Sequence, residues 1–185
     1  MQIRRILFLA AGIIFLTCRT SSAQDAGKVG VTMGYPASIG ILWHVSDKVA
    51  IRPELSIAGS TSEGSGGSFS AESDNFNFGT GVSVNFYLHT YDKLKTYFSP
   101  RFTYSRSTTD TSSSGVTTSS SETTSTTTGG SGSFGAQYEL SDKFSLYGEL
   151  GFVFSHTTVT NSNGPNKTTG NTWSTRSGAG VVFYF

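Results

Sequence analysis

Residues 75–88, NFNFGTGVSVNFYL, alternate between apolar side chains and small or polar ones. A period of two places successive side chains on opposite faces of a β-strand. One face carries Phe76, Phe78, Val82, Val84, Phe86 and Leu88, and the other carries Asn75, Asn77, Gly79, Gly81, Ser83 and Asn85. The segment therefore predicts a strand with one apolar face and one small, polar face.

Seven more segments repeat this alternation, and no stretch after residue 23 has helical periodicity. With residues 75–88, the predicted strands are residues 29–35, 39–45, 49–57, 98–104, 134–140, 144–154 and 173–185. Their connections alternate in length. Turns at 46–48 and 141–143 are tight and that at 89–95 is longer, whereas polar loops are expected near 59–74, 106–130 and 157–171. Only the first loop, around 35–37, is short. An even number of strands with short turns at one end is typical of an outer-membrane barrel.

The first residues have the composition of an export signal. Two arginines precede the apolar run ILFLAAGIIFL at 6–16, and Ser21 and Ala23 follow as small residues. The run of 11 residues is well short of the roughly 20 that a membrane-spanning helix needs. We expect a signal peptide over 1–23 and a single barrel domain over 24–185. Lipid attachment at Cys18 is the alternative, although Thr17 is unusual before an acylated cysteine.

Composition excludes several classes of function. Charged residues make up 14% of the chain, below the roughly 25% of soluble domains, while glycine and phenylalanine are abundant. A net charge of +1 gives no reason to expect a nucleic-acid partner. Without Cys18 the chain has no cysteine, and His44, His89 and His156 are far apart in sequence. We therefore expect no cofactor, no metal site and no thiol chemistry.

Charged residues within the strands distinguish a membrane barrel from a soluble β-sandwich. All six fall on the small, polar face: Arg52, Glu54, Arg101, Glu139, Glu149 and Arg176. A charge facing lipid costs about 2–4 kcal/mol for Arg or Lys at the centre of the bilayer, so a bilayer enforces this segregation. Inside a narrow barrel the six charges are expected to pair and plug the lumen. In a sandwich they would be solvated surface charges.

The C-terminus resembles the assembly signal of outer-membrane proteins. The chain stops on Phe185, with Phe183 and Ala179 on the same face and Gly180 between them, although Gly178 stands where a polar residue is usual. With eight strands and a signal peptide, residues 24–185 resemble the OmpA/OmpX-type eight-stranded outer-membrane β-barrels, also called the porin family. This resemblance implies a bacterial outer-membrane location, with lipid and lipopolysaccharide as surroundings. It also implies recognition of Gly180, Phe183 and Phe185 by the barrel-assembly machinery, and a monomer.

Three functions remain open at the level of sequence. The segment 107–128 holds 18 Ser or Thr residues among 22, which suits a disordered, glycosylated or strand-extending surface loop. A structural or surface-interaction role, by adhesion or display toward an unknown extracellular ligand, is therefore predicted. A small, low-conductance channel is the alternative. A lipid-modifying enzyme using His156 and Thr158 is disfavoured because no acidic partner lies at a convincing spacing, so no catalytic residue is assigned.

Overall fold

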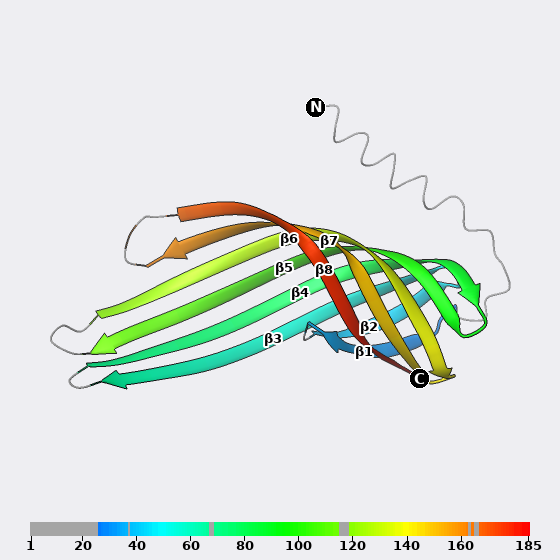
Figure 1. Cartoon of the computed structure of the whole chain (residues 1–185), viewed down its shortest axis with the longest axis horizontal. Coiled ribbons are helices and arrows are strands. Elements are labelled where there is room, and N and C mark those ends of the chain that lie inside the picture. The colour runs from blue at the N-terminus through cyan, green and yellow to red at the C-terminus, as the bar shows by residue number, and fades with distance from the viewer. Residues whose placement is uncertain (1–25, 37, 67–68, 115–118, 163, 165–166) are drawn as a thin grey trace, which may run out of the picture.

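A computed structural model of the chain describes residues 26–36, 38–66, 69–114, 119–162, 164 and 167–185. Eight antiparallel strands follow one another around a closed barrel, with β8 pairing to β1 (Figure 1). They are β1 (Val29–Tyr35), β2 (Ser38–Ser46), β3 (Val49–Gly66), β4 (Phe69–Tyr91), β5 (Leu94–Ser114), β6 (Ser119–Ser141), β7 (Phe144–Asn161) and β8 (Lys167–Tyr184). The predicted eight-stranded up-and-down barrel is confirmed. The predicted signal peptide, with Cys18, lies outside the described residues.

Side chains alternate between the lumen and the outer surface along every strand. In β4, Ser83 and Asn85 are buried inside the barrel, while Phe76 and Val82 are exposed on the outside. The cross-strand register extends this order around the barrel, since Arg52 of β3 pairs with Ser83 and Ser83 pairs with Arg101 of β5. Paired residues of neighbouring strands point to the same side of a sheet. The polar faces of the strands thus meet inside the barrel.

The strands are very unequal in length. β1 and β2 have 7 and 9 residues, whereas β3 to β8 have 18 to 23 each. The predicted loops at 59–74 and 157–171 were therefore wrong for most of their length, because β3, β4, β7 and β8 continue through them in register. Of the alternatives left open for 107–128, the strand-extending one holds for the described residues, since β5 and β6 continue to Ser114 and from Ser119. Ser and Thr on both faces hide the two-residue period, yet Thr favours strands. The predicted turn at 89–95 also narrows to Asp92-Lys93, with Asp92 at a φ of 49°.

The long strands extend the barrel wall into a polar sheet. We give this name to residues 58–66, 69–75, 105–114, 119–129, 155–161 and 167–172, which project at one end of the molecule (Figure 1). The outermost pairs of the short strands are Ile39 with Leu55 and Tyr35 with Ala179. Beyond these pairs, the described parts of β3 and β8 have a strand neighbour on one side only. The polar sheet is consequently an open, curved sheet with two free edges.

Candidate functional site

The centre of the lumen is occupied by a buried ion-pair network. Arg52 reaches Oε1 of Glu54 with Nε at 2.8 Å and Oε1 of Glu149 with Nη2 at 2.5 Å. Its Nε also donates to Oγ of Ser83 at 3.2 Å, and its guanidinium lies 4.9 Å from the ring centre of Tyr147. The Arg52 side chain is only 1% exposed, so its charge depends on these partners for compensation.

A second arginine completes the network from another strand. Arg101 of β5 lies 2.8 Å from Oε2 of Glu54 through Nη1 and 3.3 Å from Oε2 of Glu149 through Nη2. Each carboxylate therefore faces both arginines, and Oε1 of Glu54 also accepts from Nη2 of Arg101 at 3.3 Å. The hydroxyl of Tyr97 donates to Oε1 of Glu149 at 3.1 Å. This mutual pairing from β3, β5 and β7 crosslinks the barrel wall through its interior.

Glycines leave room for these large side chains. A Cβ on Gly135 would collide with the ring of Tyr97, and a Cβ on Gly180 would collide with the hydroxyl end of Tyr147. Both glycines point into the lumen from strands next to the network. Small residues marked the polar faces of the strands in the sequence. In the structure, they leave the space that allows Tyr97 and Tyr147 to cross the interior.

Two of the six predicted lumen charges stand apart from the central four. Arg176 approaches Oε2 of Glu149 only at 4.0 Å. Glu139 does not reach the network and instead pairs with Lys95 at 2.7 Å, near the tight turns. Placing Glu139 in one network with the others was therefore wrong, because position along the strand separates residues that share the inward face. The sequence analysis missed Lys95 as the partner of Glu139. Lys95 lies two residues before Tyr97 on β5, so the two-residue period could have placed it on the inward face.

A second polar layer closes the lumen toward the tight turns. Tyr87 donates to Oε1 of Gln137 at 2.9 Å, and Nε2 of Gln137 donates to the Tyr184 hydroxyl at 2.7 Å. That hydroxyl lies 3.2 Å from Nε2 of His44. The two-residue alternation in the sequence already placed Gln137 and Tyr184 on the inward, polar face, and both are buried. Two successive layers of buried side chains fill the barrel interior.

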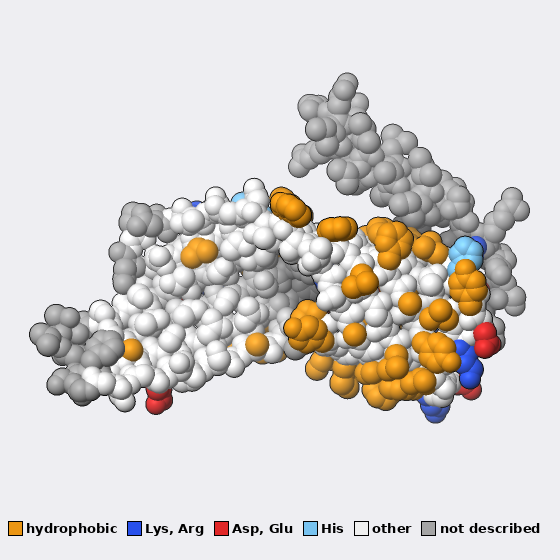
Figure 2. Space-filling view, in the orientation of Figure 1, with side chains coloured by type: hydrophobic (Ala, Val, Ile, Leu, Met, Phe, Trp, Pro, Cys, Tyr) orange, Lys and Arg blue, Asp and Glu red, His pale blue; other side chains and the backbone are white. Residues whose placement is uncertain are grey.

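The outer surface beside the two layers is an apolar band (Figure 2). Its exposed aromatic members include Tyr35, Trp43, Phe76, Phe102, Phe134, Phe152, Phe154, Trp173 and Phe183. In the described strands, the outward positions of this band carry no charged side chain. Exposed apolar area on this scale is unstable in water and suits a bilayer. No described helix is long and apolar enough to cross a membrane.

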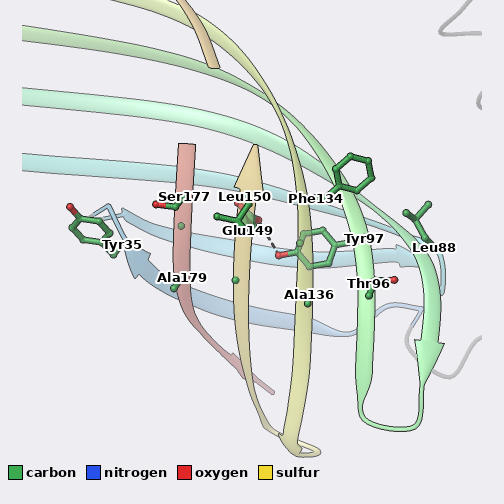
Figure 3. Close-up of a pocket in the computed structure, with 13 residues that line it drawn as sticks. Tyr35, Leu88, Thr96, Tyr97, Phe134, Ala136, Glu149, Leu150, Ser177 and Ala179 are labelled. Carbon is green, nitrogen blue, oxygen red and sulfur yellow. Dashed lines mark hydrogen bonds between the residues drawn. The ribbon is translucent and has the colours of Figure 1, made fainter. Parts of the chain in front are cut away.

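A hollow on the band crosses several strands (Figure 3). Thr96, Ala136, Gly148 and Ala179 form one cross-strand row, and their small side chains make a groove of about 630 Å³. Leu88, Phe134, Leu150 and Tyr35 also line it. The bonded pair of Tyr97 and Glu149 lies at the wall beneath. The groove faces the bilayer, and Glu149, the charged residue among those that line it, is held by Arg52 and Arg101 in the lumen network.

The charged side chains of the polar sheet lie on its outer face. Its outer face carries Glu63, Glu72, Asp74, Arg106, Asp110, Glu122, His156 and Lys167, as the cross-strand pairs and the alternation show. The described inward positions of the polar sheet are uncharged, mostly Ser, Thr, Asn and Gly. They bond across strands, as Asn75 does to Oγ1 of Thr109 at 2.7 Å and Thr123 to Asn161 at 2.6 Å.

Candidate catalytic groups do not converge. His156 lies on the outer face with Nδ1 2.8 Å from Oδ1 of Asn171, and Thr158 is on the same face of β7. Among the described residues, no three His, Cys, Asp or Glu side chains are grouped to hold a metal ion. The C-terminal residues Gly180 and Phe183 lie on β8, with Gly180 facing the lumen and Phe183 and Phe185 facing outward.

Comparison with known proteins shows the fold. No protein-family model matches the sequence, and no curated protein matches it. A major outer-membrane protein of Thermus thermophilus superposes with a TM-score of 0.50 at 14% identity, covering 85% of this chain and 98% of that one. Acinetobacter baumannii CarO gives 0.47 at 9%, covering 89% and 100%, and Yersinia pestis Ail gives 0.43 at 11%, covering 86% and 99%. The chain has the fold of a bacterial outer-membrane β-barrel.

Proposed function

We propose that this outer-membrane barrel is a surface-interaction protein, and that the polar sheet outside the membrane carries its binding function. The observation that supports this most directly is the pair of free sheet edges at residues 58–66 of β3 and 167–172 of β8. Edge strands present unpaired N–H and C=O groups that can pair with another extended chain. The expected partner is therefore an extended segment of an extracellular protein.

The outer face of the polar sheet is suited to select such a partner. Asp74, Asp110 and Glu122 occupy one cross-strand row, and Glu63 pairs with Glu72 beside it. Five carboxylates on one face favour a basic partner and repel an acidic one. Main-chain pairing at an edge would supply affinity, and this acidic face would supply selectivity.

The filled lumen supports a binding role over the channel alternative. Arg52 and Glu149 are each about 1% exposed in their side chains, and the layer of Tyr87, Gln137, Tyr184 and His44 closes the turn end. An eight-stranded barrel encloses little space beyond what side chains fill. We propose no catalytic activity, because the candidate groups do not converge.

A shortened barrel tests the proposal. Residues 60–75, 106–126 and 157–170 are each replaced by Asn-Gly, which joins the pairs Gly59–Phe76, Ser105–Thr127 and His156–Asn171. Cells displaying the intact or the shortened protein are incubated with fluorescent extracellular-matrix proteins. We expect binding by intact cells only, with a basic matrix protein bound most strongly. Equal binding by both cell types would contradict the proposal. The shortened protein must first be shown to fold, by a difference in gel migration between boiled and unboiled samples (heat modifiability).

A further inference from the structure

We propose that a cavity at the outward mouth of the lumen binds an anionic oxygen group, a phosphate or a carboxylate, between Arg101 and Arg176. The cavity has a volume of about 290 Å³ and is lined by both arginines, with Glu54, Ser131, Pro36 and Ser38 among its other walls. Water occupies about 30 Å³ per molecule, so the cavity has room for an oxyanion and several waters. The site is separate from the sheet edges of the proposed function.

The charges around the cavity do not balance. Arg52, Arg101 and Arg176 supply three guanidinium groups, whereas Glu54 and Glu149 supply two carboxylates. All four carboxylate oxygens already face Arg52 or Arg101 at 3.3 Å or less. Arg176 is the surplus cation, because its closest carboxylate oxygen is 4.0 Å away and is already shared with Arg101.

The geometry suits a bridging anion. Nη2 of Arg101 and Nη2 of Arg176 both approach Oε2 of Glu149, at 3.3 and 4.0 Å, so the two guanidinium groups are neighbours. Guanidinium forks match the oxygens of phosphate and carboxylate. Nε of Arg101 and Oγ of Ser131 are also buried without a hydrogen-bond partner in the described part of the chain. Both residues line the cavity, so small side-chain rotations would offer two more donors.

The short hairpin of β1 and β2 provides access. Pro36 and Ser38 line the cavity at the end of this hairpin, and Arg176 lies on the part of β8 that has no β1 neighbour. The Arg176 side chain is 16% exposed, compared with 1% for Arg52 and Glu149. An anion can therefore reach the site from the water above the mouth or, because the apolar band continues past the hairpin to Trp173, from a lipid headgroup at its side.

The first arm of the test uses inorganic phosphate with the detergent-folded protein. Phosphate is titrated against chloride at constant ionic strength, and the midpoint of thermal unfolding is measured. Arg176→Gln removes the surplus cation, and Arg106→Gln removes one from the outer face of the polar sheet as a matched control. We expect a saturable rise in the midpoint for the wild type and Arg106→Gln, with half-saturation at least tenfold weaker in Arg176→Gln. Equal responses of the two variants, or no response beyond chloride, would exclude free phosphate as the anion, and the second arm then decides whether the site stands.

The second arm identifies the source of the anion. The same proteins are reconstituted in phosphatidylcholine nanodiscs with or without phosphatidic acid, and the phosphatidic acid that remains after delipidation is counted. Retention by the wild type and Arg106→Gln but not by Arg176→Gln supports a lipid phosphate at the site. A response to free phosphate alone supports a soluble anion. The proposal would be refuted if Arg176→Gln behaved like the wild type in both the phosphate titration and the lipid retention, with the variant still folded as judged by its gel shift on heating.

Discussion

At the scale of single residues, Glu149 is the acceptor on which the lumen network depends. Its two oxygens face Arg52, Arg101, Arg176 and the hydroxyl of Tyr97. Buried ion pairs add little stability over an apolar core, but removal of one partner leaves an uncompensated charge. The network therefore makes the barrel sensitive to single substitutions at its centre.

We expect Glu149→Ala to lower the free energy of unfolding by about 3–5 kcal/mol, because two buried arginines lose a shared counter-charge. Urea unfolding in lipid vesicles, followed by the gel shift of the folded barrel, measures this change. Glu63→Ala is the control, since Glu63 is exposed and pairs across strands with Glu72. Its unfolding free energy should stay within about 0.5 kcal/mol of the wild type. A loss below 1 kcal/mol for Glu149→Ala would show that the network is not compensating buried charge.

We expect Gly135→Ala to destabilise the barrel by about 1–3 kcal/mol, the usual range for overpacking. The added methyl group meets the ring of Tyr97, whose hydroxyl is held by Glu149 and cannot easily move. Gly64→Ala, where a Cβ meets nothing within 4 Å, should leave stability almost unchanged. The same unfolding assay compares the two variants, and equal stabilities would contradict the close packing described for Tyr97.

At the scale of the element, β7 crosses from the apolar band into the polar sheet on one outward face. Leu150, Phe152 and Phe154 are exposed on this face, and His156, Thr158 and Thr160 continue it. The change from apolar to polar side chains marks where the strand leaves the bilayer. A charge should therefore be costly on one part of the strand and tolerated on the other.

Leu150→Arg is expected to make folding into vesicles less favourable by about 2–4 kcal/mol, which is the cost of an arginine near the middle of a bilayer. Thr158→Arg adds the same group to the same face of β7 and should cost less than about 1 kcal/mol. Folding titrations in phosphatidylcholine vesicles give both values. If the two substitutions cost the same, the apolar band would not be the surface in contact with lipid.

At the scale of the whole molecule, closure of the sheet and filling of the lumen make two linked predictions. Protein extracted from the outer-membrane fraction should migrate differently on a gel with and without boiling, because a closed barrel resists unfolding in detergent. In planar bilayers it should carry no steady ionic current. A steady current that changes in Arg101→Ala would favour the channel alternative, and recovery in the soluble fraction without a gel shift would contradict the membrane assignment.

The sequence by itself determined the eight strands, their antiparallel order and the side of the wall on which each residue lies. These follow from the local two-residue period, which is strong wherever an apolar residue alternates with a small one, as in residues 75–88. The same alternation placed Arg52, Glu54, Arg101 and Glu149 on the inward face. These four residues form the ion-pair network in the lumen. The predicted polar loops at 59–74 and 157–171 failed because Ser and Thr on both faces leave no such contrast.

Only the tertiary structure decided where along the barrel each inward residue lies and which partner it meets. Glu139 and Glu149 share strand-like alternation and charge, yet one pairs with Lys95 and the other with Arg52 and Arg101. Their positions depend on the register of all eight strands, which is set by closure of the sheet. The free edges of β3 and β8 likewise arise from the short β1 and β2, a relation between distant parts of the chain. Local periodicity carries no information on either relation, because both depend on contacts between residues far apart in sequence.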